Sequence, residues 1–142
     1  MNTNRSAKEL LLTYLENVTD ADKAIELFAD DATFELPYLA SLGLPWKWQG
    51  KDVLYKFLQN LPNTFPGFKF QNIRIHIDTP DQVFGEYEID AKVAKTGKPY
   101  HQHYMGRLVA ENGKIKLIRE ALDMAQVAKS HSVDGIWDLT DK

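Results

Sequence analysis

The second half of the chain alternates apolar and polar residues over four consecutive stretches. The alternation has a period of two residues in FQNIRIHID (70–78), GEYEIDAKVA (85–94), PYHQHYMGRLVA (99–110) and KIKLIREAL (114–122). That period predicts strands with one buried face. The connections TPDQ, KTGK and ENG are short enough to be hairpin turns. These four stretches are therefore predicted to form an antiparallel meander.

The first half of the chain predicts helices. Apolar residues recur at helical spacing over residues 5–18 and 51–60, and Thr19 or Asp20 can cap a short helix between them. Pro62 is expected to end the last helix. Helices followed by a meander are typical of an α+β fold, in which a curved antiparallel sheet wraps as a cone around the N-terminal helices. The open end of such a cone is a natural pocket for a small ligand.

Length and composition indicate one domain over residues 1–142. The net charge is −3, which disfavours nucleic acid as a partner. No run approaches the ~20 apolar residues of a membrane span. The chain has no cysteine, which excludes disulfides and thiolate sites and fits a cytoplasmic location. The tail from Ala125 is predicted to form a short helix over the fold, with Trp137 as an apolar anchor.

His101 and His103 lie two residues apart, so they share one face of their strand. A two-residue turn at 96–97 would pair Lys95 with Lys98 and turn both histidines to the outer face, beside carboxylates. A slip of one residue would turn them into the pocket instead. A metal site is the least favoured interpretation, because it would need a third ligand, so no metal is expected.

The next hairpin leaves the position of Glu120 open. A two-residue turn at Asn112-Gly113 predicts a register that puts Tyr104 and Glu120 on opposite faces of the sheet. A β-bulge would bring both side chains inside, and Gly106 is the expected place for it.

Three segments carry a resemblance to a known family. LFADDATFELP, WQGKDVLYKFL and NGKIKLIREALD, in this order, resemble the nuclear-transport-factor-2-like superfamily, and within it the SnoaL-like polyketide cyclases and ketosteroid isomerases. The resemblance covers residues 5–125. It implies a cone-shaped α+β barrel, a buried pocket and a homodimer packed through the sheet.

The resemblance also implies roles for individual residues. Tyr14 matches the oxyanion-hole tyrosine of the ketosteroid isomerases. Leu36 stands where that family has its aspartate base, and Tyr104 or Met105 stands where it has a protonated aspartate. Both catalytic carboxylates are thus missing, which argues against steroid isomerisation by that mechanism.

Glu120 is the predicted acid and base of the site. It follows Arg119, as the catalytic aspartate of the SnoaL-like cyclases follows an arginine in the last strand. A carboxyl in an apolar cavity has a raised pKa, which suits proton transfer near neutral pH. Tyr14 could then donate a hydrogen bond to a developing enolate oxygen. Further ligand contacts are expected from Gln102, Tyr104, Trp46 and Trp48.

These residues predict an enzyme without a cofactor, since no phosphate loop, serine-centred triad or cofactor fingerprint is present. The expected activity is that of an isomerase, cyclase or dehydratase acting on a small, hydrophobic carbonyl compound. The alternative is a non-catalytic ligand-binding or protein-interaction module on the same fold. A homodimer is expected through the outer face of the meander, where Met105 and Val109 add apolar surface to ion pairs.

Overall fold

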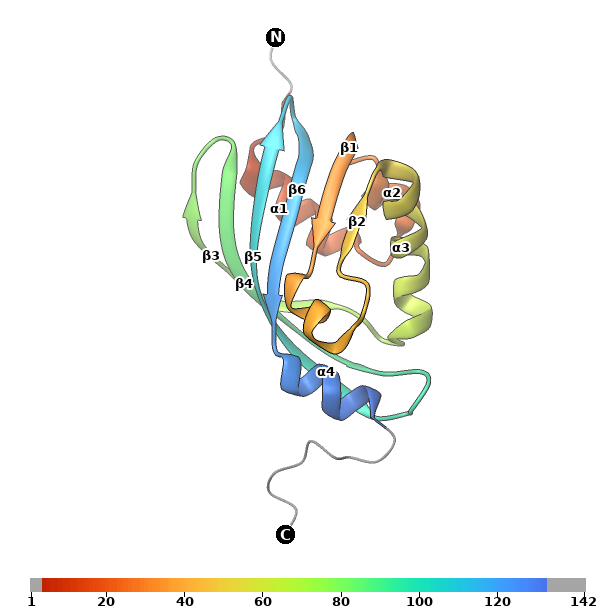
Figure 1. Ribbon diagram of the computed structural model, residues 1–142. Coiled ribbons are helices and arrows are strands. Elements are labelled where there is room, and N and C mark those ends of the chain that lie inside the picture. The colour runs from red at the N-terminus through yellow and green to blue at the C-terminus, as the bar shows by residue number, and fades with distance from the viewer. Residues whose placement is uncertain (1–3, 133–142) are drawn as a thin grey trace.

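The computed structural model describes residues 4–132, in which a curved sheet packs against helices (Figure 1). In chain order the elements are α1 (Ala7–Asn17), α2 (Ala21–Ile25), β1 (Phe28–Glu35), the 3₁₀ helix η1 (Pro37–Leu42), β2 (Lys47–Gln49), α3 (Lys51–Thr64), β3 (Phe70–Asp78), β4 (Gln82–Lys92), β5 (Pro99–Glu111), β6 (Lys114–Leu122) and α4 (Met124–His131). The predicted α+β class, with a curved sheet and N-terminal helices, is confirmed.

Polar side chains cap three of the helices. Ser6 Oγ accepts a hydrogen bond from the Glu9 N–H at 3.2 Å, and Asp20 does the same for the second helix. Asp123 caps α4, and its carboxylate accepts from two backbone N–H groups. Pro62 does not end α3, contrary to the prediction. It lies in the last turn, where its missing N–H removes one hydrogen bond without stopping the chain from continuing to Thr64.

The six strands run in the order β2-β1-β6-β5-β4-β3. The meander predicted for the second half of the chain is present, since β3, β4, β5 and β6 pair antiparallel in sequence order. One pair departs from the predicted antiparallel sheet, because β1 lies beside β6 in parallel. The first strand therefore joins the meander at the edge that carries Glu120.

The register of the β4–β5 hairpin differs from the prediction. Lys95 does not pair with Lys98; the structure pairs Asp90 with His101, two residues away from the predicted register. The connection is wider than two residues, and Gly97 closes it in the left-handed conformation at a φ of 72°. A shift of two residues keeps every side chain on its face. The histidines of β5 therefore stay on the outer face.

A β-bulge between β5 and β6 decides which face Glu120 occupies. The bulge was predicted at Gly106 but lies at Val109–Ala110. Beyond it, Gly106 lies opposite Glu120, and Tyr104 lies on the same face as Gly106. The side chains of Tyr104 and Glu120 therefore both point to the concave side of the sheet.

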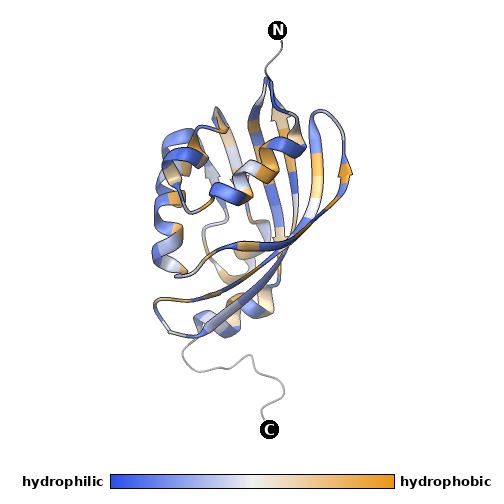
Figure 2. Cartoon of the chain, turned by 180° about the vertical axis from the view of Figure 1, so that it is seen from behind, coloured by the Kyte–Doolittle hydropathy of each residue, from blue (hydrophilic) through white to orange (hydrophobic). Residues whose placement is uncertain are grey.

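The concave side packs against α1 and α3, and apolar and polar colours alternate along the strands that face it (Figure 2). Strand β3 departs from this pattern, because Ile73 and Ile77 are 39% and 63% exposed. A positive φ at Asn72 and two register shifts break the alternation there. No helix within residues 4–132 is long and apolar enough to cross a membrane. Trp137, the expected anchor of the tail, lies outside the described residues.

Candidate active site

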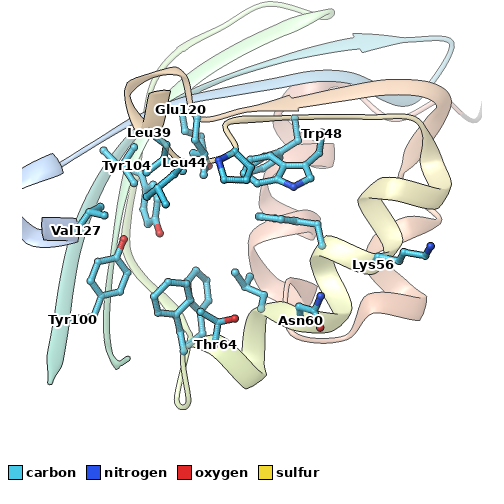
Figure 3. A pocket seen from close by; sticks show the side chains of 18 of the residues that line it. Leu39, Leu44, Trp48, Lys56, Asn60, Thr64, Tyr100, Tyr104, Glu120 and Val127 are labelled. Carbon is cyan, nitrogen blue, oxygen red and sulfur yellow. The ribbon is translucent and has the colours of Figure 1, made fainter. Parts of the chain in front are cut away.

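A cavity of about 480 Å³ lies between the concave face of the sheet, α3 and α4 (Figure 3). Figure 3 shows Tyr100 and Tyr104 on one side of the cavity and Trp48 and Lys56 on the other. Its walls are mostly apolar. The polar groups that line it are Tyr14, Tyr100, Tyr104, Glu120 and His131, together with Lys56, Asn60 and Thr64 of α3.

Glu120 is the buried acid of this cavity. Its side chain comes from β6 and the residue is only 2% exposed. Burial raises the pKa of Glu120 to about 7, because an apolar environment disfavours the charged form, while the hydrogen bond from Tyr87 opposes the rise. The Tyr87 hydroxyl donates that hydrogen bond to Glu120 Oε2. At neutral pH both forms of the carboxyl are populated, so the group can accept and return a proton.

Gly106 leaves the space that the Tyr87 hydroxyl occupies. A Cβ atom built at Gly106 would collide with that hydroxyl and would lie 3.3 Å from Glu120 Cγ. The Tyr87 ring is itself fully buried and packs against Phe70 and Tyr104, so it has little freedom to move aside. Glycine at this position is therefore a condition for the hydrogen bond to Glu120.

Tyr14 brings a phenol to the same cavity from α1. It is 1% exposed, and the edge contact of its ring with Phe28 (5.7 Å, 86°) fixes its direction. Burial, and next the negative charge of Glu120, raise the pKa of Tyr14 well above its ordinary value. The phenol therefore keeps its proton and is available as a hydrogen-bond donor.

The remaining predicted ligand contacts divide into two groups. Tyr104 and Trp48 line the cavity, and Trp48 forms its aromatic wall with Phe57 at a centroid distance of 4.5 Å. Trp46 does not line it; the Trp46 carbonyl accepts the Leu36 N–H at 2.7 Å instead. Gln102 does not line it either; its amide is hydrogen-bonded to the backbone of His103 and Asp123 and to the Tyr100 hydroxyl.

Several residues of the site escaped the sequence analysis. The alternation of residues 85–94 predicts that the Tyr87 side chain faces inward, but its contact with Glu120 depends on the bulge between β5 and β6. Phe65 and His131 come from the loop after α3 and from α4, and no sequence pattern relates those segments to the cavity.

The histidines of the sheet lie on the opposite face. His101 Nδ1 lies 2.7 Å from Asp90 Oδ1, and His103 Nε2 lies 2.6 Å from Glu86 Oε1. His76 Nε2 approaches the other oxygen of Glu86 at 2.8 Å. The hydrogen bond from His103 holds the pKa of Glu86 below its ordinary value. Across residues 4–132 no group of three histidine or acidic side chains is arranged to hold a metal ion.

Comparison with known proteins identifies the family. The sequence profile of the SnoaL-like domain matches residues 12–118. This chain belongs to the SnoaL-like domain family. It is 26% identical over 134 residues to the phenazine biosynthesis protein PhzB 2 of Pseudomonas aeruginosa (strain UCBPP-PA14), which covers 91% of this chain and 82% of that protein.

Two solved structures show the same fold as this SnoaL-like chain. A Bacillus subtilis protein provisionally described as an isomerase superposes with a TM-score of 0.79 at 25% identity, over 89% of this chain and 93% of that one. A Xanthomonas campestris pv. campestris protein provisionally described as a polyketide cyclase superposes with a TM-score of 0.75 at 18% identity, over 89% and 96%.

Replacement of Tyr87 by Phe should raise the pKa of Glu120 above about 7, because it removes the hydrogen bond that stabilises the carboxylate. The pKa can be followed by the pH dependence of the carboxyl infrared band or by carbon NMR of labelled glutamate. Tyr14→Phe is the matched control, since no hydrogen bond joins Tyr14 to Glu120 among residues 4–132. A pKa that is unchanged in Tyr87→Phe would contradict this role of the hydroxyl.

The protein should lose stability as pH rises, and Glu120→Gln should remove that loss. The folded pKa of Glu120 is raised from the ordinary 4.5 to about 7, so its contribution is complete below pH 4.5 and disappears as pH rises through 7. This rise of the Glu120 pKa corresponds to roughly 3 kcal/mol of unfolding free energy. Urea unfolding at pH 4.5 and pH 8 measures the effect. Exposed Glu16 supplies the control variant, Glu16→Gln, which should keep the wild-type pH dependence.

Proposed function

We propose that this protein is a cofactor-free enzyme that moves a proton next to the carbonyl of a small, mostly apolar compound, as an isomerase, cyclase or dehydratase does. The observation that carries the proposal is one buried carboxyl with a pKa of about 7, facing a cavity with mostly apolar walls. A general base works best when its pKa lies near the working pH.

The mechanism assigns one step to each group of the site. The Glu120 carboxylate takes the proton from the carbon next to the substrate carbonyl. The electron pair of that C–H bond forms the C=C bond of an enolate, and the π pair of the carbonyl moves to its oxygen. The Tyr14 hydroxyl donates a hydrogen bond to the enolate oxygen that results. Glu120 then returns the proton to another carbon in an isomerisation, or to a departing hydroxyl in a dehydration.

The named relatives support this class of reaction. One is described provisionally as an isomerase and another as a polyketide cyclase, and PhzB 2 is named for phenazine biosynthesis. A cavity with Phe34, Trp48 and Phe57 in its wall suits flat conjugated compounds of that kind.

Exchange of deuterium from solvent into a ketone measures the proposed proton transfer without knowledge of the natural substrate. We expect the protein to accelerate exchange at the acidic CH₂ of 2-tetralone. Glu120→Gln should lower that rate by roughly 10²- to 10⁴-fold, the usual contribution of a general base. Glu35→Gln is the control, because this carboxylate is bound to Arg119 at 2.5 Å on the other side of the sheet.

Full exchange activity in Glu120→Gln would remove Glu120 from the mechanism. If the wild-type protein binds 2-tetralone in its cavity but exchanges nothing across a panel of such ketones, the protein is a ligand-binding module instead.

We also propose a homodimer that packs through the outer face of the sheet. The side chains of Ile77, Phe84 and Met105 lie on that face, and the residues are at least partly exposed there, Met105 to 47%. The ion pairs of His101, His103 and their carboxylates lie beside them. A face that combines apolar groups with fixed ion pairs suits a two-fold contact, in which each patch meets its own copy.

Met105→Glu should shift the protein from dimer to monomer, because it puts a like charge on both sides of the contact. Light scattering at micromolar concentration measures the mass. Leu12→Glu is the control, since Leu12 is 36% exposed on α1, away from the sheet face. A monomer mass for the wild-type protein would refute the dimer, and a dimer indifferent to Met105→Glu would place the contact elsewhere.

A further inference from the structure

Tyr100 is a buried phenol of the cavity that the proton-transfer chemistry does not use. It lies on β5, is 3% exposed and lines the cavity. Its ring stacks on Phe65 at a centroid distance of 4.7 Å and 18°, and the His131 ring contacts it edge-on at 5.8 Å. The Phe65 and His131 rings also contact each other at 5.7 Å, so the three rings form one cluster that restricts the direction of the Tyr100 side chain.

Gln102 determines which way the Tyr100 hydroxyl bonds. Gln102 Oε1 accepts from the backbone N–H groups of His103 (2.9 Å) and Asp123 (2.6 Å). Its Nε2 must then be the donor, and it donates to the Asp123 carbonyl (3.0 Å) and to the Tyr100 hydroxyl (2.9 Å). Because three backbone groups fix the orientation of this amide, Tyr100 can only accept from it.

The proton of the Tyr100 hydroxyl is left for another partner. The hydroxyl oxygen accepts from Gln102 Nε2, and this is its hydrogen bond within residues 4–132. Among those residues no side chain or backbone group accepts the Tyr100 O–H. Because the residue lines the cavity, that O–H is available to a bound ligand.

This donor lies apart from Glu120 along one wall of the cavity. Glu120 faces Gly106 across β5 and β6, and Tyr100 lies six residues further along β5 on the same face. Figure 3 shows Tyr104 between Glu120 and Tyr100 along this wall of the cavity. A ligand bound over Glu120 and Tyr14 must extend along the cavity to reach the Tyr100 hydroxyl, with the aromatic wall of Trp48 and Phe57 beside it.

We propose that Tyr100 is a ligand-binding residue that donates a hydrogen bond to an oxygen remote from the reacting carbon. The inference rests on the proposed function for the reacting end of the ligand. The substrate is accordingly a flat, conjugated compound with two oxygen acceptors, one at the Glu120–Tyr14 end and a carbonyl or carboxylate oxygen at the Tyr100 end. Gln102 is a positioning residue in this arrangement, since it acts only through Tyr100.

Calorimetric binding of two matched probes tests the proposal. 2-Acetylnaphthalene carries one carbonyl, and 2,6-diacetylnaphthalene carries a second at the far end of the same ring system. The wild-type protein should bind the diacetyl probe roughly three- to tenfold more tightly, the effect of one additional hydrogen bond. Tyr100→Phe should remove this preference and leave the affinity for the monoacetyl probe within about twofold. Tyr55→Phe, outside the cavity on α3, should keep the preference.

The outcomes separate this inference from the proposed enzyme activity. Loss of the preference in Tyr100→Phe, with the preference retained in Glu120→Gln, supports the second donor whether or not the protein turns over a ketone. An equal affinity of the wild-type protein for both probes overturns the inference, and so does a preference that survives Tyr100→Phe. A 6-acetylnaphthalene-2-carboxylate arm, compared with 2,6-diacetylnaphthalene, shows whether the remote oxygen is preferred as a carboxylate or as a ketone.

Discussion

The hydrogen bond between the Tyr87 hydroxyl and the buried carboxyl of Glu120 is the interaction on which the cavity depends. A carboxyl in such an apolar place is costly unless it is hydrogen-bonded. The bond exists only because Gly106 leaves room for the hydroxyl, and Gly106 faces Glu120 only because the bulge at Val109–Ala110 sets the register. The strand register, the space at Gly106 and the raised pKa of Glu120 therefore all depend on one short segment of β5 and β6.

The same strands carry two different chemistries on their two faces. The concave face collects phenols and one carboxyl among aromatic walls. The outer face pairs imidazoles with carboxylates, as in the contacts of His101 with Asp90 and of His103 with Glu86. A register shift of one residue would exchange these sets, whereas the observed shift of two in the β4–β5 hairpin leaves them in place. Which side chains face the cavity therefore depends on whether a register shift is odd or even, not on the exact pairing of residues.

Membership of the SnoaL-like family indicates the fold, but the chemistry depends on which residues occupy individual positions of the cavity. Leu36 stands where the resemblance to ketosteroid isomerases would place an aspartate, and it lines the cavity as an apolar residue. The carboxyl of this cavity comes from β6 instead, across from Tyr14 of α1. The proposed ligand contacts come from two phenols, Tyr14 of α1 and Tyr100 of β5, and Gln102 donates a hydrogen bond to the hydroxyl of Tyr100.

The sequence by itself determined the α+β class, the meander and the face of most strand residues, because alternation and turn residues act locally. It also singled out Glu120 and Tyr14, whose side chains the structure brings into one cavity. Only the tertiary structure decided the bulge position, the partner of Glu120 and the roles of Trp46 and Gln102. Each of these depends on contacts between segments distant in sequence, such as Gln102 with Asp123, and local patterns carry no information about such contacts.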